Sequence, residues 1–214
     1  MKTEPRAFIL ANTRLMAPPH VPEISLYLAD EAHDLWLKTE EDLEAIGLPP
    51  PFWAFAWAGG QGLSRYILDH PEVVRGRHVL DFATGSGLVA IAALRAGAAG
   101  VTATDIDPWT QSAVALNAGA NGVELTFCGE DLVGRAVDAD VVLAGDVFYD
   151  RTFADRLVPW FTALADAGRT VIVGDPGRAY LPKESLLALA TYQVPVTRAL
   201  EDSEIKKTTV WRFA

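Results

Sequence analysis

The sequence predicts an α/β fold, in which a doubly wound, mostly parallel sheet carries helices on both faces. From residue 78 onward, short runs rich in Val, Ile and Leu alternate with longer runs of helical periodicity, which is the pattern of β–α–β units. Four apolar runs end in Asp or carry it one residue from the end, at Asp81, Asp105, Asp146 and Asp175. Ligands of parallel sheets bind beyond these carboxyl ends, so the four carboxylates mark the edge at which a site is expected.

Residues 1–75 form an N-terminal extension to this alternating core, which spans 76–214, and the two are expected to share one structural domain. Proline-rich stretches at 17–22 and 48–51 punctuate short elements of the extension. The run 61–69, "QGLSRYILD", predicts an amphipathic helix that places Leu63, Tyr66 and Ile67 on one face.

The core elements follow in order from residue 78. Strands are predicted at 78–82, 101–105, 123–127, 139–146 and 169–175, with helices at 87–97, 109–121 and 153–168. The last two β-like runs, 191–196 and 206–213, have no good helix between them. They predict a hairpin-like end in which one strand runs antiparallel to the rest.

Composition excludes several classes of function. The chain has 214 residues, 50% of them apolar, and a net charge of −10, which disfavours a nucleic acid partner. The acidity serves solubility or attraction to a basic protein surface. Cys128 is the only cysteine and His20, His33, His70 and His78 lack metal-ligand spacing, so we expect no disulfide and no metal. No membrane span or secretory leader is recognisable, and a cytoplasmic location is expected.

The loop "DFATGSG" after the first core strand suits a nucleoside ligand. Gly85 and Gly87 allow close backbone approach, although they also suit a tight turn that binds nothing. Asp105 ends the next strand, where a carboxylate can accept both ribose hydroxyls in NAD proteins and S-adenosylmethionine proteins alike. Asp81 would repel a pyrophosphate but favours the sulfonium and ammonium groups of S-adenosylmethionine. The loop therefore favours the methyl donor.

Several motifs resemble a known family. "VLDFATGSG", "TDID" and "GDVFY" are similar to motifs of the seven-stranded, Rossmann-like S-adenosylmethionine-dependent (class I) methyltransferases. The acid-x-x-Tyr pattern from Asp146 to Tyr149 resembles the family-16 protein lysine methyltransferases. "AFILANT", "PPFWAFAWAGGQGLSRYILD" and "GDPGRAYLP" resemble the enzymes, of the bacterial type, that methylate lysines of the electron transfer flavoprotein beta subunit. This resemblance covers nearly the whole chain.

The resemblance implies a cofactor site built from matching residues. Gly85 and Gly87 would line the methionine part of S-adenosylmethionine, Asp105 would bind the ribose, and Ile106 would lie beside the adenine. Trp57 would pack near the cofactor, and residues 1–75 would cover the cofactor and the substrate side.

Two further residues have open alternatives. Trp53 lies four residues before Trp57, so in a helix both rings would share a face, but ordinary core packing explains it equally well. Asp131 is a candidate for binding the adenine amino group, and an exposed turn carboxylate is the alternative.

The stretch "GDVFYD" at 145–150 provides the catalytic candidates. Phe148 and Tyr149 can wall a narrow channel for a lysine, and Asp146 can orient its amine. Alternatively, Phe148 anchors the core and Asp146 caps the helix that begins near residue 153. Asp175 and Arg178 shape the substrate rim or form a fixed turn with an internal ion pair.

Four functions follow from these features. The first is a protein-lysine methyltransferase that acts on the electron transfer flavoprotein beta subunit, which the resemblance implies. The second is a methyltransferase of another protein, such as a ribosomal one, or of a small amine, with residues 1–60 as a lid. The third is an NAD-dependent oxidoreductase, for which no convincing catalytic His or Tyr-Lys set is found. The fourth is an inactive binding module, which has no need of Gly85, Gly87, Asp105 and Asp146 together.

Overall fold

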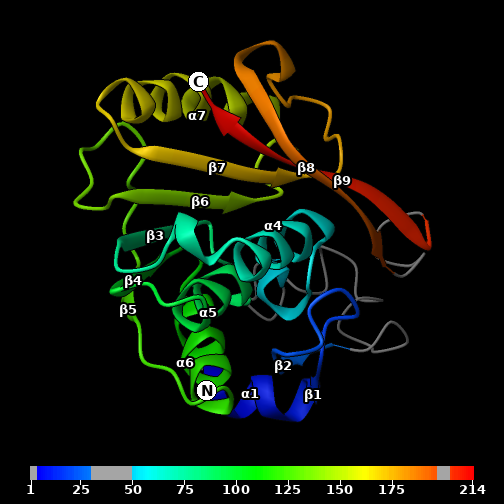
Figure 1. The fold of residues 1–214 in the computed structure, drawn as a ribbon. Helices are drawn as coiled ribbons and strands as arrows, with labels where there is room; N and C mark the ends of the chain where they lie inside the picture. Colours follow the sequence, from blue (N-terminus) through cyan, green and yellow to red (C-terminus); the bar gives the residue numbers. More distant parts are fainter. Residues whose placement is uncertain (1–3, 30–49, 197–202) are drawn as a thin grey trace.

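A seven-stranded sheet forms the centre of the molecule. The computed structural model describes residues 4–29, 50–196 and 203–214, and within these ranges the strand order is β5-β4-β3-β6-β7-β9-β8 (Figure 1). The strands are β3 (His78–Phe82), β4 (Gly100–Thr104), β5 (Thr126–Cys128), β6 (Val141–Gly145), β7 (Thr170–Asp175), β8 (Leu186–Pro195) and β9 (Ile205–Phe213). All neighbours pair in parallel except β9, which is antiparallel to both β7 and β8. The predicted fold class is confirmed, including the antiparallel last strand.

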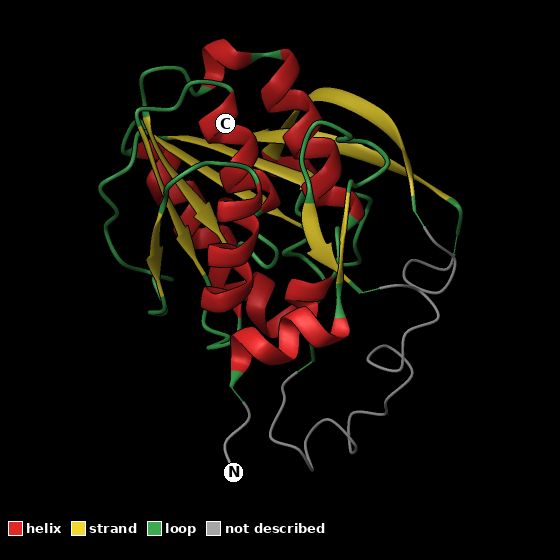
Figure 2. Cartoon of the chain, turned by 90° about the horizontal axis from the view of Figure 1, so that it is seen from below, coloured by secondary structure: helices red, strands yellow, loops and turns green. Residues whose placement is uncertain are grey.

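Helices cover both faces of this sheet (Figures 1 and 2). They are α4 (Ala58–Asp69), α5 (Leu88–Arg95), α6 (Thr110–Ala120) and α7 (Arg151–Asp166). Side chains alternate along each strand. Leu80 and Phe82 of β3 therefore pack in one core cluster with α7, whereas Val79 packs in another with α4, α5 and α6.

The predicted core elements agree with the structure within a few residues, with two differences of extent. The strand expected at 123–127 is only Thr126–Cys128, and β8 begins at Leu186 rather than at residue 191. β8 is an edge strand whose partner β9 follows it in sequence, and a register shift at Ala188/Ala190 interrupts the ladder. Such an irregularity obscures the alternation from which a strand is predicted.

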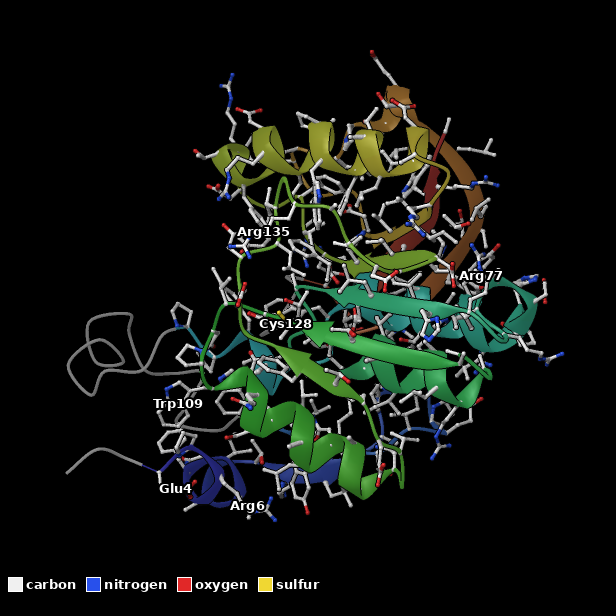
Figure 3. The ribbon with its side chains drawn as sticks, turned by 90° about the vertical axis from the view of Figure 1, so that its left-hand side faces the viewer. Glu4, Arg6, Arg77, Trp109, Cys128 and Arg135 are labelled. Atoms are coloured by element: carbon white, nitrogen blue, oxygen red, sulfur yellow. The ribbon has the colours of Figure 1, made fainter. Side chains whose placement is uncertain are left out.

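The part of the N-terminal extension that precedes α4 packs against α6. It contains α1 (Pro5–Asn12), the antiparallel pair β1 (Arg14–Met16) and β2 (Leu26–Leu28), and the short 3-10 helix η1 (Phe52–Ala54). Two further 3-10 turns are η2 (Pro71–Val73) and η3 (Lys183–Ser185). Phe8 of α1 meets Trp109 at the start of α6 edge to face, with ring centroids 5.2 Å apart, and Figure 3 shows Trp109 beside the helix that begins after Glu4.

Side-chain hydrogen bonds tie β2 to α6. Tyr27 donates its backbone amide to the side-chain oxygen of Asn117, and Ser25 donates its own to Asn121. None of the helices in the described ranges is long and apolar enough to cross a membrane.

Candidate active site

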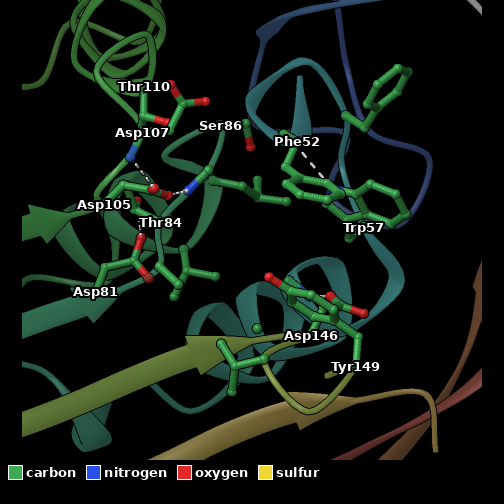
Figure 4. A pocket seen from close by; sticks show the side chains of 18 of the residues that line it. Phe52, Trp57, Asp81, Thr84, Ser86, Asp105, Asp107, Thr110, Asp146 and Tyr149 are labelled. Atoms are coloured by element: carbon green, nitrogen blue, oxygen red, sulfur yellow. Dashed lines mark hydrogen bonds between the residues drawn. The ribbon is translucent and has the colours of Figure 1, made fainter. Parts of the chain in front are cut away.

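A cavity of about 390 Å³ opens where the strand order reverses, between β3 and β6. Its walls come from the loops after β3, β4 and β6, from the segment that leads into α4, and from Arg178 after β7. Figure 4 shows Asp81 and Asp105 on one side of the cavity and Phe52 and Trp57 across from them, with Asp146 and Tyr149 below these two rings. This is the position at which open parallel sheets bind ligands.

Asp81 stabilises the loop after β3 by hydrogen bonds. Its Oδ2 accepts hydrogen bonds from the Thr84 hydroxyl and, at 2.9 Å, from the Ala90 amide of α5. Only 1% of Asp81 is exposed, and this burial raises the pKa of its carboxyl to about 7, while the two hydrogen bonds oppose the rise. Asp81 also lines the cavity, where a ligand cation would favour its ionised form.

Asp105 connects two of the cavity loops. Its Oδ2 accepts the Gly85 amide at 3.1 Å, and its Oδ1 accepts the Asp107 amide at 3.0 Å. Gly85 and Gly87 have positive φ, at 52° and 81°, which glycine adopts without strain. Each carboxylate oxygen has a second lone pair, so Asp105 can still accept a pair of ligand hydroxyls.

Asp107 adds a third carboxylate on this side of the cavity. Burial raises the pKa of Asp107 to about 6, opposed by the hydrogen bond from the Trp109 amide and helped by the charge of Asp105. Ile106 also lines the cavity and is 72% exposed. Because this isoleucine is exposed beside the cavity, it offers an apolar surface to a flat ring.

Aromatic side chains form the opposite wall. Phe52, Phe55, Trp57, Tyr149 and Phe153 all line the cavity. Phe52 lies between Trp57 and Tyr149, with ring centroids 5.9 Å and 6.0 Å from theirs. Tyr149 is 54% exposed, and burial of its hydroxyl, followed by the charges of Asp105 and Asp150, raises its pKa. These rings form the kind of wall that excludes water from a reacting amine.

Gly60 and Arg178 both help to hold Asp146 at the end of β6. Its Oδ2 accepts the Gly60 amide of α4 at 2.9 Å, and its Oδ1 accepts Arg178 Nη2 at 2.7 Å. Its φ is 60°, and Ala83 is the other non-glycine residue with positive φ among the described residues. Both residues lie at strand ends that line the cavity. Such backbone strain persists where the surroundings enforce it, typically at functional sites.

Close backbone packing brings the first turn of α4 to Asp146. A Cβ at Gly59 would lie 2.3 Å from the Gly174 carbonyl oxygen and 2.5 Å from Asp146 Oδ2. A Cβ at Gly145 would lie 2.8 Å from Gly60 Cα. These glycines allow the amide end of α4 to approach the carboxylate, which is favourable for a negative charge.

The loop after β7 positions Arg178. Asp175 Oδ1 accepts the amides of Gly177 and Arg178 at 2.6 and 2.7 Å. Arg178 Cζ lies 5.7 Å from the centroid of the Trp57 ring. The fixed turn expected here is therefore present. Arg178 pairs with Asp146, and its charge also acts on Asp175 within the turn.

Some predicted site residues lie elsewhere. Phe148 has no exposed surface and belongs to the core cluster beside α7, which fits the core-anchor alternative. The alternative that Asp146 caps α7 is wrong, because Asp150 is the cap and accepts the Phe153 amide. Asp131 does not line the cavity and pairs with Arg156 at 2.7 Å.

Trp53 and Trp57 do not share a helix. Trp53 lies in η1 and is fully buried, whereas Trp57 precedes α4 and lines the cavity. Further residues line the cavity without being predicted from the sequence as site residues, among them Phe52, Phe55, Gly60, Thr84, Asp107 and Thr110. For Asp107 a signal existed, because it follows Asp105 in the quoted "TDID".

Comparisons with known proteins agree with this geometry. The family model described as "Ribosomal protein L11 methyltransferase (PrmA)" matches residues 63–148. The electron transfer flavoprotein beta subunit lysine methyltransferase of Xenopus laevis is 39% identical over 99% of this chain and 87% of its own length. The enzyme of that name from Homo sapiens is 36% identical over 98% of this chain and 82% of its own length.

A solved structure shares the fold. The magnesium protoporphyrin IX methyltransferase of Synechocystis PCC 6803, with bound SAM, aligns with a TM-score of 0.52 and 17% identity. The alignment covers 72% of this chain and 78% of that one.

Proposed function

The chain belongs to the electron transfer flavoprotein beta subunit lysine methyltransferases and is a protein-lysine methyltransferase that uses S-adenosylmethionine, and we propose that its substrate is the beta subunit of an electron transfer flavoprotein. The observation that carries the proposal is the 39% identity to the Xenopus laevis enzyme over 99% of this chain. The site agrees with a lysine acceptor, because Asp146 is a buried carboxylate in the cavity wall, three residues before the half-exposed ring of Tyr149. A hydrogen-bond acceptor beside an aromatic wall suits the amine of a lysine side chain.

The residues of the cavity fit S-adenosylmethionine. Four aspartates and one arginine are the charged residues that line the described cavity, and that arginine is paired. This charge balance suits a ligand that carries a sulfonium and an ammonium and has no phosphate. We propose that Asp105 binds the ribose, that Ile106 lies beside the adenine, that Gly85 lies at the methionine part, and that Asp81 and Trp57 lie near the cofactor. Gly87 does not line the cavity, and its proposed role is to shape the turn that carries Gly85.

Methyl transfer is a displacement at carbon. Bound S-adenosylmethionine supplies the methyl group: the new N–C bond forms as the C–S bond breaks, and the positive charge moves from sulfur to nitrogen. The chain's own residues need supply little covalent chemistry, so their main contribution is to position the two reactants.

The lysine nitrogen must first lose a proton to water. At pH 7 a free lysine amine lies roughly 4.6 kcal/mol above its protonated form, for an ordinary pKa of ~10.4. The aromatic wall of Phe52, Trp57 and Tyr149 lowers this cost by removing water from the charged form. Asp146 accepts a hydrogen bond from the amine and thereby directs the lone pair of the lysine nitrogen at the methyl group.

The acceptor is assigned from the relatives rather than from the cavity. The methyltransferase family model covers residues 63–148, which contain the cofactor loops and Asp146 but not the loop after β7. A single cysteine in the chain suits a reducing compartment, and we propose that the reaction takes place in the cytoplasm.

The test combines substrate and site. Purified enzyme is incubated with labelled S-adenosylmethionine and recombinant electron transfer flavoprotein, beside Asp146→Ala, and both subunits are analysed by mass spectrometry. We expect methylated lysines on the beta subunit for the wild type, and loss of methylation in Asp146→Ala with retained binding of S-adenosylhomocysteine. Asp155→Asn is the control, because this carboxylate lies exposed on α7 with a side chain that is 74% accessible.

Cofactor binding without methylation of either subunit would exclude the flavoprotein as substrate. Labelled acceptors would then be sought in a cell extract, in which a ribosomal protein or a small amine would identify the alternative. Full activity of Asp146→Ala would remove Asp146 from the mechanism.

A further inference from the structure

Arg178 is the one cation among the described residues that line the cavity, beside Asp81, Asp105, Asp107 and Asp146. Contacts with three described residues help to hold it in place. Its guanidinium donates to Asp146 Oδ1 at 2.7 Å, its Cζ lies 5.7 Å from the Trp57 ring centroid, and its amide donates to Asp175 Oδ1. The side chains of Arg178 and Asp146 are only 21% and 9% exposed, so water screens this ion pair poorly.

An isolated carboxylate at this position would work against the reaction. A negative charge next to a lysine favours the protonated amine, which has no lone pair for the methyl group. Asp146 is therefore useful as a hydrogen-bond acceptor but harmful as a net charge. A second cation next to Asp146 removes this conflict, because it neutralises the charge and leaves the acceptor atoms in place.

Resting on the function proposed above, we propose that Arg178 is a positioning residue that neutralises Asp146 and thereby admits the substrate lysine as a neutral amine. Asp146 Oδ1 accepts Arg178 and Oδ2 accepts Gly60. A carboxylate oxygen can accept more than one hydrogen bond, so an amine N–H can bind to the same group. The amine that enters thus meets a neutral ion pair instead of a bare carboxylate.

Among the described residues, further charged groups lie around the pair of Arg178 and Asp146. Asp81, Asp105 and Asp107 line the cavity on the side of β3 and β4, opposite the aromatic wall (Figure 4). Asp175 lies behind Arg178 and accepts its amide, Lys183 acts on Asp175 from the same loop, and Asp150 acts on the Tyr149 hydroxyl from the start of α7. The first turn of α4 contributes amides and no charged side chain.

The test is the pH dependence of the transfer step. Single-turnover rates are measured at saturating cofactor and flavoprotein, because such rates report ionisations within the complex. In Arg178→Gln we expect the acidic limb of the profile to move upward by about one pH unit or more. The rate should approach that of the wild type again at high pH. Arg178→Lys keeps the charge and should leave the acidic limb near its wild-type position.

A matched control distinguishes this role from a structural one. Arg135 pairs with Glu130 at 2.6 Å on the surface, outside the cavity, and Arg135→Gln should reproduce the wild-type profile. A merely structural role for Arg178 would lower the rate of Arg178→Gln by the same factor at every pH. That result, or a shift of the limb to lower pH, would overturn the proposal.

A second measurement needs no protein substrate. Binding of n-butylammonium to the enzyme saturated with S-adenosylhomocysteine is followed by NMR. Arg178→Gln should bind this cation at least about tenfold more tightly than the wild type and Arg178→Lys, because the carboxylate is no longer neutralised. Equal binding would refute the inference even if the flavoprotein is methylated. A wild type that leaves the flavoprotein unmethylated would refute only the proposed substrate, and the binding comparison would then decide the inference.

Discussion

The amide of Gly60 donates to Asp146 Oδ2 at 2.9 Å, so the first turn of α4 and the end of β6 meet directly at the catalytic candidate. Gly60 belongs to the extension before the alternating core, and Asp146 directly follows the fourth strand of that core. The extension therefore shapes the site and is more than a cover for it.

Gly59→Ala should damage this contact. The new Cβ would lie 2.3 Å from the Gly174 carbonyl oxygen, which is backbone and cannot move aside easily. We expect a loss of about 3 kcal/mol or more in the free energy of unfolding, together with weaker activity. Thermal and urea denaturation provide the measurement.

Gly119→Ala is the matched control for that change. Gly119 also lies in a helix, α6, and nothing stands within 4 Å of a Cβ built there. Alanine should stabilise this helix by about 0.5–1 kcal/mol. A Gly59→Ala protein as stable as the wild type would show that α4 can shift away from β7.

Asp105→Asn should weaken cofactor binding. The amide group that replaces one carboxylate oxygen cannot accept from a ribose hydroxyl and would oppose the donor amide of Gly85 or Asp107. We expect the Kd for S-adenosylhomocysteine to rise tenfold or more. At a ligand concentration 100 times the wild-type Kd, stabilisation should fall from about 2.7 to about 1.4 kcal/mol. An unchanged Kd by calorimetry would remove Asp105 from the cofactor site.

Asp81 should make stability depend on pH. Burial raises the pKa of its carboxyl from 3.8 to about 7, so the folded protein retains a proton that the unfolded chain releases. The contribution to stability is complete below pH ~4 and is lost as the pH rises toward 7, on the order of 1.4 kcal/mol per pH unit.

Asp81→Asn tests this dependence. Asparagine has no proton to release, and its oxygen can still accept from Thr84 and Ala90. Between pH 4 and 7, urea denaturation should show that the wild type loses stability relative to Asp81→Asn. The exposed Asp166 on α7 provides the control variant Asp166→Asn, which should run parallel to the wild type. Parallel curves for Asp81→Asn as well would contradict the raised pKa.

Tyr149→Ala should mainly lower activity, whereas Phe148→Ala should mainly lower stability. Tyr149 is 54% exposed in the cavity wall, so its removal should lower kcat/KM for the protein substrate tenfold or more and cost about 1 kcal/mol of stability or less. Phe148 is fully buried, and its removal should cost about 3–5 kcal/mol. Tyr149→Phe keeps the ring and should remain near wild-type activity. If Tyr149→Phe were as impaired as Tyr149→Ala, the hydroxyl rather than the ring would be required.

The strand ends were predictable from sequence, and the reason is geometric. Parallel strands end at the same edge of the sheet, so Asp81, Asp105 and Asp146 had to come close once the alternating pattern was recognised. The structure places all three on the cavity. The roles of these side chains toward cofactor and substrate stay predictions that the variants above test.

The two neighbours in "GDVFYD" could not be distinguished from sequence. Both are large aromatic residues after a buried strand, and the positive φ of Asp146 redirects the chain there, so strand alternation no longer tells which ring faces the core. The pair between Arg178 and Asp146 was equally hidden, because it joins two loops 32 residues apart. Short-range spacing carries no information about such a contact.

The position of β9 between β7 and β8 affects how the protein is made. Chains emerge from the ribosome N-terminus first, and domains fold as their parts appear. The strands β3 to β7 can pair while synthesis continues, whereas β8 must wait for β9, its only neighbour in the described sheet. Until residues 205–213 have been synthesised, the edge of β7 and both edges of β8 stay open to other chains. A nascent chain is therefore most prone to aggregation late in translation, when the cavity loops after β3, β4 and β6 are already complete.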